Sequence, residues 1–232
     1  MKKRTRKRLV MAKQLLMRNN VALASYPRSG NTWLGKLVEE LSRRRTGSIY
    51  EEYVFPRPFC GIVIKTHKMD GKRYSRFIHL VRNPFDAISS HFDHQQAFSG
   101  KCGRPWNAHV RSGVLAWKKH TAYWLALPHP HVTLRYEDLI SNPICELKRV
   151  QDFLGLANSD EQVERAVAAC TIEKLREQCR SQGSDADSFF RHGQVGHDID
   201  RFSDEQVGYF HHELSQLMQR LGYAAPLRRD SA

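Results

Sequence analysis

The chain has 232 residues, of which 41% are hydrophobic and 26% are charged. This composition excludes global disorder and fits one domain built around one substantial core. The net charge of +13 comes from 37 Lys and Arg against 24 Asp and Glu. Such a charge favours anionic partners, such as nucleotides, acidic glycans, nucleic acid or anionic lipid, without choosing among them.

The cysteines are too scattered to predict a disulfide framework or a zinc site. No CxxC pair occurs among Cys60, Cys102, Cys145, Cys170 and Cys179. No window reaches the roughly 18 consecutive apolar residues that span a bilayer, and no apolar signal region opens the chain. We therefore expect a soluble, cytoplasmic protein. The histidines form no convincing ligand set, so no metal is expected.

Residues 1–20 form a basic segment with eight Lys and Arg and no acidic residue. A block of like charges repels itself, so we expect a tail that is either a solvated extension or a contact for an anionic surface. One globular domain is predicted over residues 21–226, and a short C-terminal tail over residues 227–232.

Strands and helices alternate along this domain. Short apolar runs predict strands at residues 21–25, 62–64, 77–81 and 131–134. Helical spacing and start signals predict helices that follow residue 32, start at Pro84, and cover residues 108–124, Pro143 to Leu154 and 203–221. Asn83 and Asn142 stand at N-cap positions, and Ser203 opens a Ser-x-x-Gln capping box. The pattern predicts an α/β domain with a mainly parallel sheet flanked by helices.

The turn-rich segment Tyr26-Pro-Arg-Ser-Gly-Asn-Thr32 lies where the first strand leads into a helix. Backbone N–H groups at such a helix start converge on an anion, and Arg28 adds a positive charge. The segment is therefore predicted to bind phosphate. It lacks the GxxxxGK[ST] order of a Walker A loop, which weakens an ATPase or kinase interpretation. An ordinary glycine turn is the alternative.

Four motifs resemble the PAPS-dependent sulfotransferase family, where PAPS is 3'-phosphoadenosine 5'-phosphosulfate. Tyr26 to Leu34 is similar to the family's 5'-phosphosulfate-binding loop, which reads YPKSGTTW in cytosolic members. Lys65-Thr66-His67, then Arg82-Asn83-Pro84 with Ser90, and finally Arg191-His192-Gly193 follow in the family's order. Residues 21–223 are most similar to the sulfotransferase domain of WSC-domain proteins and of some bacterial enzymes. The resemblance implies a P-loop NTPase-like sulfotransferase fold.

The resemblance also implies a reaction, in which a sulfuryl group passes from PAPS to a hydroxyl or amine of an unidentified acceptor and leaves PAP. His67 would be the general base, Lys65 would hold the sulfuryl oxygens, and Arg28 would stabilise the leaving-group oxygen. Residues expected to contact the cofactor are Arg28, Ser29, Gly30, Asn31 and Thr32 on the 5'-phosphosulfate, Trp33 on the adenine or in the core, Arg82 and Ser90 on the 3'-phosphate, and Tyr136, Arg191 and Gly193.

Eight helical residues span about 12 Å. One phosphate can therefore touch both Arg82 and Ser90 only if the arginine side chain reaches along the helix. Taken alone, Arg82 could equally pair with Asp86. Glu137 and Asp138 are interpreted as structural.

The chain departs from the family's pattern at three positions. Arg28 stands where cytosolic members usually have lysine, His192 also replaces a lysine, and Ile172 replaces an aromatic residue. These departures and the charge leave a second hypothesis open, a catalytically silent protein of the same fold that binds polyanions. A P-loop kinase is a third. Residues 50–60 and 92–106 are expected to line the acceptor pocket, and no specific nucleic acid is expected. The WSC-domain proteins are anchored in the Golgi, which makes the Golgi lumen the alternative location.

Overall fold

The computed structural model describes residues 21–49, 61–99, 105–181 and 198–223. The centre of this part of the chain is one parallel sheet with strands in the order β2-β3-β1-β4-β5. The strands are β1 (Val21–Ser25), β2 (Gly47–Ser48), β3 (Ile64–Thr66), β4 (Arg76–Val81) and β5 (His131–Arg135). The predicted α/β fold with a parallel sheet is confirmed.

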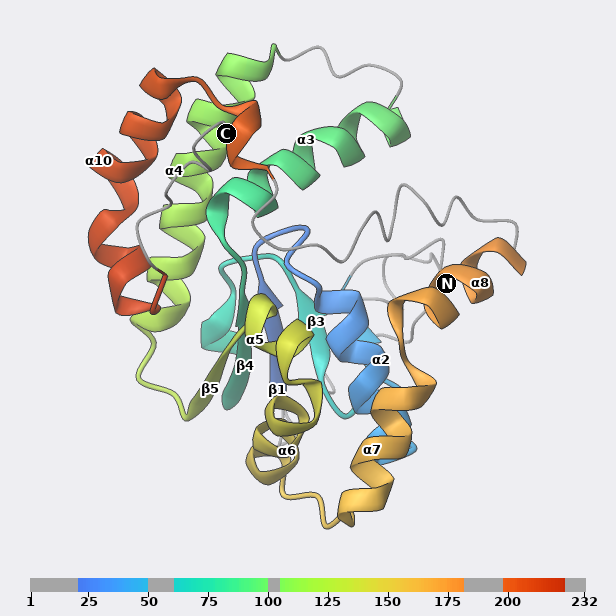
Figure 1. Cartoon of the computed structure of the whole chain (residues 1–232). Coiled ribbons are helices and arrows are strands. Elements are labelled where there is room, and N and C mark those ends of the chain that lie inside the picture. The colour runs from blue at the N-terminus through green and yellow to red at the C-terminus, as the bar shows by residue number, and fades with distance from the viewer. Residues whose placement is uncertain (1–20, 50–60, 100–104, 182–197, 224–232) are drawn as a thin grey trace, which may run out of the picture.

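Helices cover both faces of the sheet (Figure 1). One face carries α2 (Asn31–Ser42), α6 (Pro143–Leu154) and α7 (Asp160–Ala169), and the other carries α4 (Trp106–Leu125), against which α3 (Pro84–Ser99) and α10 (Asp204–Arg220) pack. Shorter elements are α5 (Tyr136–Ser141), α8 (Ile172–Ser181) and the 3₁₀ turns Gly71–Arg73 and Ile199–Arg201. No helix in the described ranges has the length and apolar character needed to cross a membrane.

The central strand β1 is buried on both faces because its residues alternate between two core clusters. Leu23 packs with the α2 side of the core, whereas Ala22 and Ala24 pack with Phe77 and Trp124 on the α4 side. Parallel sheets covered on both sides give such continuous apolar strands. The chain leaves β1 for β2 on one side and returns to β4 on the other, so the carboxyl end of β1 is the switch point where ligands bind in open α/β sheets.

All three predicted N-cap residues precede a helix, and two of them cap it through their side chains. The Ser203 hydroxyl accepts a bond from the Gln206 N–H, and the Gln206 side chain accepts one from the Ser203 N–H. The Asn83 side chain accepts a bond from the Phe85 N–H. Asn142 is the N-cap of α6, as predicted, but its side chain makes no cap bond with a described residue. The same residue ends α5, where its N–H donates to the Asp138 carbonyl at 2.7 Å.

Candidate functional site

The loop from β1 to α2 presents an open helix start. Gly30 is the N-cap of α2 with φ of 89°, and no side chain among the described residues caps the helix. Arg28 also has a left-handed backbone, with φ of 67°. The first turn of α2 carries no acidic residue. Its backbone N–H groups have no intrahelical acceptor by geometry, so they suit an anion.

Glycine is required at position 30 both by the left-handed backbone and by the close approach of the Tyr136 ring. A Cβ on this residue would lie 2.5 Å from Tyr136 Cδ2 and 2.7 Å from Cε2, closer than real contacts allow. The Tyr136 ring is held there by the edge of Trp33, with centroids 6.0 Å apart, and by the Arg82 guanidinium 4.6 Å from its centroid. The loop therefore rests directly on a fixed aromatic ring.

Arg28 joins the two residues predicted to share a phosphate. Arg82 Nη1 donates to the Arg28 carbonyl at 3.0 Å, and Arg28 Nε donates to Ser90 Oγ at 3.2 Å. Trp117 anchors the main chain at Arg82, because its indole N–H donates to the Arg82 carbonyl at 3.1 Å. Arg28 therefore links Arg82 to Ser90, and a phosphate shared by these two residues stays a prediction.

Lys65 on β3 and His67 directly after it contact the start of α2 and the end of β1. Lys65 is 8% exposed, and its Nζ donates to Thr32 Oγ1 at 2.8 Å. His67 Nδ1 lies 2.8 Å from the Ser25 carbonyl oxygen and 3.3 Å from Ser25 Oγ. A carbonyl can only accept, so the proton of the neutral imidazole sits on Nδ1 and the lone pair on Nε2. This is the tautomer that a general base acting through Nε2 requires.

Burial is the main reason that the pKa of His67 falls to about 3, and the Lys65 charge lowers it further, against the smaller effect of the Ser25 carbonyl. Both causes disfavour the imidazolium. A lowered pKa keeps the His67 imidazole neutral near pH 7 and leaves the Nε2 lone pair unprotonated.

The remaining predicted cofactor residues differ in their surroundings. Ser29 is fully buried, and its hydroxyl has no hydrogen-bond partner among the described residues. Asn31 fastens the loop to β1 by donating to the Leu23 carbonyl and to Ser25 Oγ at 3.0 and 2.9 Å. Trp33 lies in the main core and donates its indole N–H to the Cys170 carbonyl, so the adenine contact stays a prediction. Arg191, His192 and Gly193 lie outside the described residues.

One protein family matches this chain over most of its length. The family profile described as the sulfotransferase domain matches residues 64–222. The chain belongs to this family. The matched stretch includes Lys65, His67, Arg82 and Ser90, whereas the loop before α2 precedes it.

The curated relatives of this chain are distant in sequence. A WSCD family member of Aedes aegypti is 30% identical over 167 residues, 62% of this chain and 53% of the relative. The chain therefore spans about half the length of that relative. Rat sulfotransferase 1A1 is 24% identical over 200 residues, 69% of this chain and 68% of the relative.

Two solved structures share the fold. Mouse sulfotransferase SULT7A1, crystallised with PAP, has a TM-score of 0.71 and 20% identity, covering 91% of this chain and 90% of that one. Retinol dehydratase in complex with androsterone and the inactive cofactor PAP has a TM-score of 0.70 and 18% identity, covering 96% of this chain and 88% of the other. These likenesses confirm the predicted sulfotransferase fold.

Sequence reasoning missed two buried histidines behind the loop between β1 and α2. The His120 ring on α4 lies 6.2 Å from the Tyr26 ring and 6.2 Å from the His79 ring on β4, centroid to centroid. None of the four nitrogens of His79 and His120 has a hydrogen-bond partner among the described residues. Burial lowers the pKa of both. Isolated histidines carry no periodic signal, so only the fold brings these two together.

Glu137 and Arg201 make further hydrogen bonds to residues that lie beside predicted site residues. Glu137 was interpreted as structural, and its carboxylate accepts bonds from the Asn83 N–H and the Tyr223 hydroxyl, both at 2.8 Å. Arg201 contacts the Asp93 carboxylate at 2.7 and 3.0 Å and donates to Ser89 Oγ, next to Ser90 on α3. The arginine and its partners are 108 and 112 residues apart, so no local pattern predicts this contact.

Proposed function

We propose that the chain transfers the sulfuryl group of PAPS to a hydroxyl or amine of an acceptor, leaving PAP. The observation that carries the proposal is the convergence of an uncapped helix start, two linked arginines and a neutral histidine at the carboxyl end of β1. Family membership supports sulfuryl transfer in general. The PAP in the two solved relatives supports this nucleotide as the product.

The described residues fit a bound nucleotide with two anionic ends. The buried Ser29 hydroxyl, which lacks a partner among them, and the open start of α2 would bind the 5'-phosphosulfate, with Lys65 beside Thr32. Arg82 and Ser90, joined through Arg28, would bind the 3'-phosphate through charge-assisted bonds. When bound, PAPS supplies the sulfuryl group and a phosphate leaving group.

His67 would take the acceptor's proton at Nε2, because its Nδ1 proton is engaged by the Ser25 carbonyl. Burial, reinforced by the Lys65 charge, keeps the imidazole neutral before the reaction. Lys65 would also place a positive charge where the sulfuryl oxygens would lie. Arg28 would stabilise the negative charge that develops on the leaving-group oxygen. Since arginine does not give up a proton, its role would be electrostatic alone.

The test is transfer of labelled sulfate from PAPS to a panel of phenols, aliphatic alcohols, amines and neutral saccharides. His67→Asn should lower kcat by about 10²–10⁴ with PAP affinity kept, as expected for loss of a general base. His212→Asn, at a side chain 82% exposed on α10, is the matched control and should leave kcat unchanged. Full activity of His67→Asn would contradict the assigned role, and absence of transfer to every acceptor would count against the enzyme.

The charge of +13, with eight Lys and Arg in residues 1–20, favours one alternative, a silent protein that binds polyanions. Replacing the basic residues between Lys2 and Arg8 with neutral ones separates the two functions. Polyanion binding should then collapse, whereas PAPS turnover should survive if the chain is an enzyme.

A further inference from the structure

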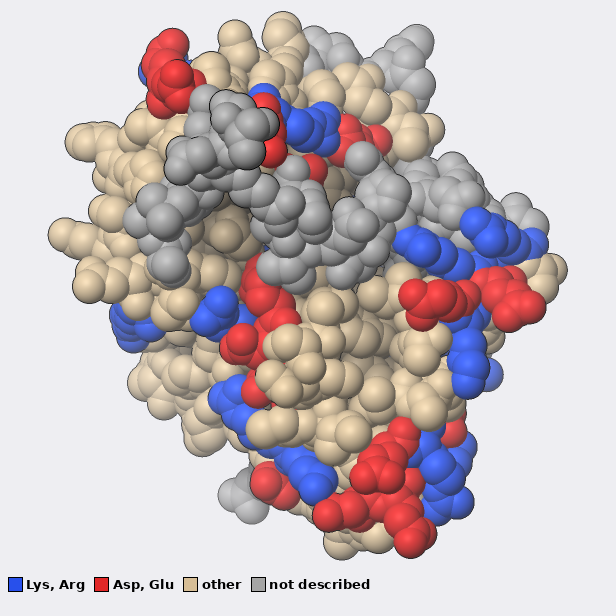
Figure 2. Space-filling model, viewed as in Figure 1, with Lys and Arg blue, Asp and Glu red and all other residues tan. Residues whose placement is uncertain are grey.

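A second cationic site lies outside the proposed cofactor site, at the edge of the sheet. β5 is the last strand in the sheet order, and a cavity of about 360 Å³ opens beside it. Arginines from three elements line it, Arg135 from β5, Arg149 from α6 and Arg220 from α10, together with Thr133 and Asp138. Figure 2 shows basic side chains alternating with acidic ones along the side of the molecule that carries α5, α6 and the end of α10.

Two of these arginines are already fixed in place. Arg135 Nη1 donates to the Gly222 carbonyl at 2.9 Å, and its guanidinium lies 4.5 Å from the centroid of the Tyr223 ring. Arg149 Nη2 donates to the Thr133 carbonyl at 3.1 Å, and Nη1 pairs with Glu146 at 2.6 Å. A guanidinium has five N–H donors, so both retain donors for a ligand. Fixed donors lose little entropy when they bind.

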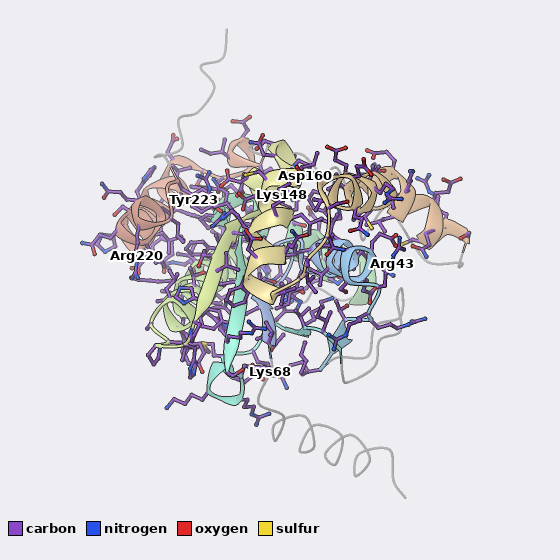
Figure 3. The ribbon with its side chains drawn as sticks, turned by 90° about the horizontal axis from the view of Figure 1, so that it is seen from below. Arg43, Lys68, Lys148, Asp160, Arg220 and Tyr223 are labelled. Atoms are coloured by element: carbon purple, nitrogen blue, oxygen red, sulfur yellow. The ribbon has the colours of Figure 1, made fainter. Side chains whose placement is uncertain are left out.

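The third arginine and the threonine hydroxyl have no polar partner in the part of the chain that the structure describes. The Arg220 side chain makes no hydrogen bond or ion pair with any described residue. Figure 3 shows Arg220 and Tyr223 near the end of α10. Thr133 Oγ1 is buried and has no hydrogen-bond partner within the described chain. A buried hydroxyl without a partner costs free energy unless water or a ligand supplies one. The cavity therefore offers one cation and one hydroxyl to a ligand.

The charges around the cavity nearly balance. Glu146 neutralises Arg149 at 2.6 Å, and Asp138 lies 3.8 Å from Arg135 Nε. Three guanidinium groups against these two carboxylates leave one net positive charge. A sulfate monoester or a carboxylate carries one negative charge, whereas a phosphate monoester carries about 1.5 to 2 at pH 7.

We propose that this cavity binds a monoanionic oxyanion, a sulfate monoester or a carboxylate, carried by a ligand of about monosaccharide size. The volume lies at the small end of the roughly 300–1,000 Å³ of small-molecule sites and exceeds what one ion fills. Arg220 supplies the charge, Arg135 and Arg149 supply fixed donors, and Thr133 supplies the hydroxyl. The site shares no residue with the proposed cofactor site.

The test titrates glucose 6-sulfate, glucuronate, glucose 6-phosphate and inorganic sulfate into the full chain by calorimetry at constant ionic strength. Glucose 6-sulfate and glucuronate should bind, and Arg220→Gln should weaken both at least tenfold because it removes the uncompensated charge. Arg43→Gln is the matched control, since Arg43 is exposed at the end of α2 and pairs with Glu40. It should change nothing, and PAP affinity should be the same in all three proteins.

Thr133→Val is a second variant, which keeps the side-chain shape and should weaken the same ligands several-fold. Equal binding by wild type and Arg220→Gln would overturn the site. Tighter binding of the phosphate ester than of the sulfate ester would overturn the charge argument. Inorganic sulfate that binds as tightly as the sugar sulfate would overturn the proposed ligand size. Each outcome is read from binding alone, so it does not depend on the proposed transferase activity.

Discussion

Replacing Gly30 by alanine should destabilise the protein and weaken PAP binding through two separable effects. The first is backbone strain, because an L-residue in the left-handed region costs roughly 1–2 kcal/mol and Gly30 has φ of 89°. The second is overlap of the new Cβ with Tyr136 at 2.5 Å. Overpacking of this kind costs about 1–3 kcal/mol. Together the free energy of unfolding should fall by about 2–5 kcal/mol.

Gly155 offers a matched control for this variant. It ends α6 with φ of 69°, and a Cβ there would meet no atom of the described residues within 4 Å. Gly155→Ala should therefore lose only the roughly 1–2 kcal/mol of strain. Urea denaturation measures both losses, and calorimetry with PAP measures the second effect. PAP affinity should fall at least tenfold in Gly30→Ala, because Tyr136 and Arg82 must move, and should be unchanged in Gly155→Ala. Equal losses of stability and affinity in the two variants would refute the reasoning.

Buried polar groups give three further predictions. Burial lowers the pKa of His67 to about 3, so protonation of this residue should not reduce kcat/KM as the pH falls from 8 through 6.5. A decrease of kcat/KM with a midpoint at pH 6.5 or above would contradict this. Burial also lowers the pKa of His79 and His120. Below pH 6.5 each of these histidines therefore takes up a proton only when the protein unfolds. As the pH falls below 6.5, the free energy of unfolding should decrease by about 1.4 kcal/mol per pH unit for each histidine. His120→Asn should remove one such slope between pH 6.5 and about 4 in urea titrations, and an unchanged slope would argue against it. Glu137→Leu should lower the free energy of unfolding by about 1–3 kcal/mol for each of the two donors left without an acceptor, the Asn83 N–H and the Tyr223 hydroxyl. Tyr223→Phe should lower it by only about 1 kcal/mol. Similar losses in the two variants would show that the Glu137 carboxylate contributes little to stability.

Local patterns predicted the elements whose signals lie within one turn or strand. The apolar run of β1, the turn before α2 and the capping box at Ser203 all agree with the structure. The strand predicted at residues 62–64 instead spans Ile64–Thr66, because its pairing with β1 begins where Ile64 meets Ala22. That register depends on a partner strand 42 residues away and has no local signal. The capping box from Ser159 to Gln162 was in the sequence and was overlooked, so α7 was not predicted.

Family motifs named the site residues, but their mutual contacts depend on the order of strands. Arg28 meets Arg82 and Ser90 only because β1 and β4 are neighbours in the sheet. The resemblance of residues 26–34 to the family's YPKSGTTW loop predicted that Arg28 contacts the leaving-group oxygen. It did not predict the bond from Arg28 to Ser90. The hydrogen bond from His67 to the Ser25 carbonyl, which sets the tautomer, is invisible to sequence reasoning because backbone acceptors carry no residue signature.

Calorimetric titration of PAP into wild type, Arg82→Ala and His67→Ala tests the central claim most directly. Wild type should bind PAP, Arg82→Ala should lose most of the affinity, and His67→Ala should bind almost normally because the base serves the acceptor. A wild-type chain that does not bind PAP would contradict the proposed sulfotransferase activity and favour the polyanion-binding alternative.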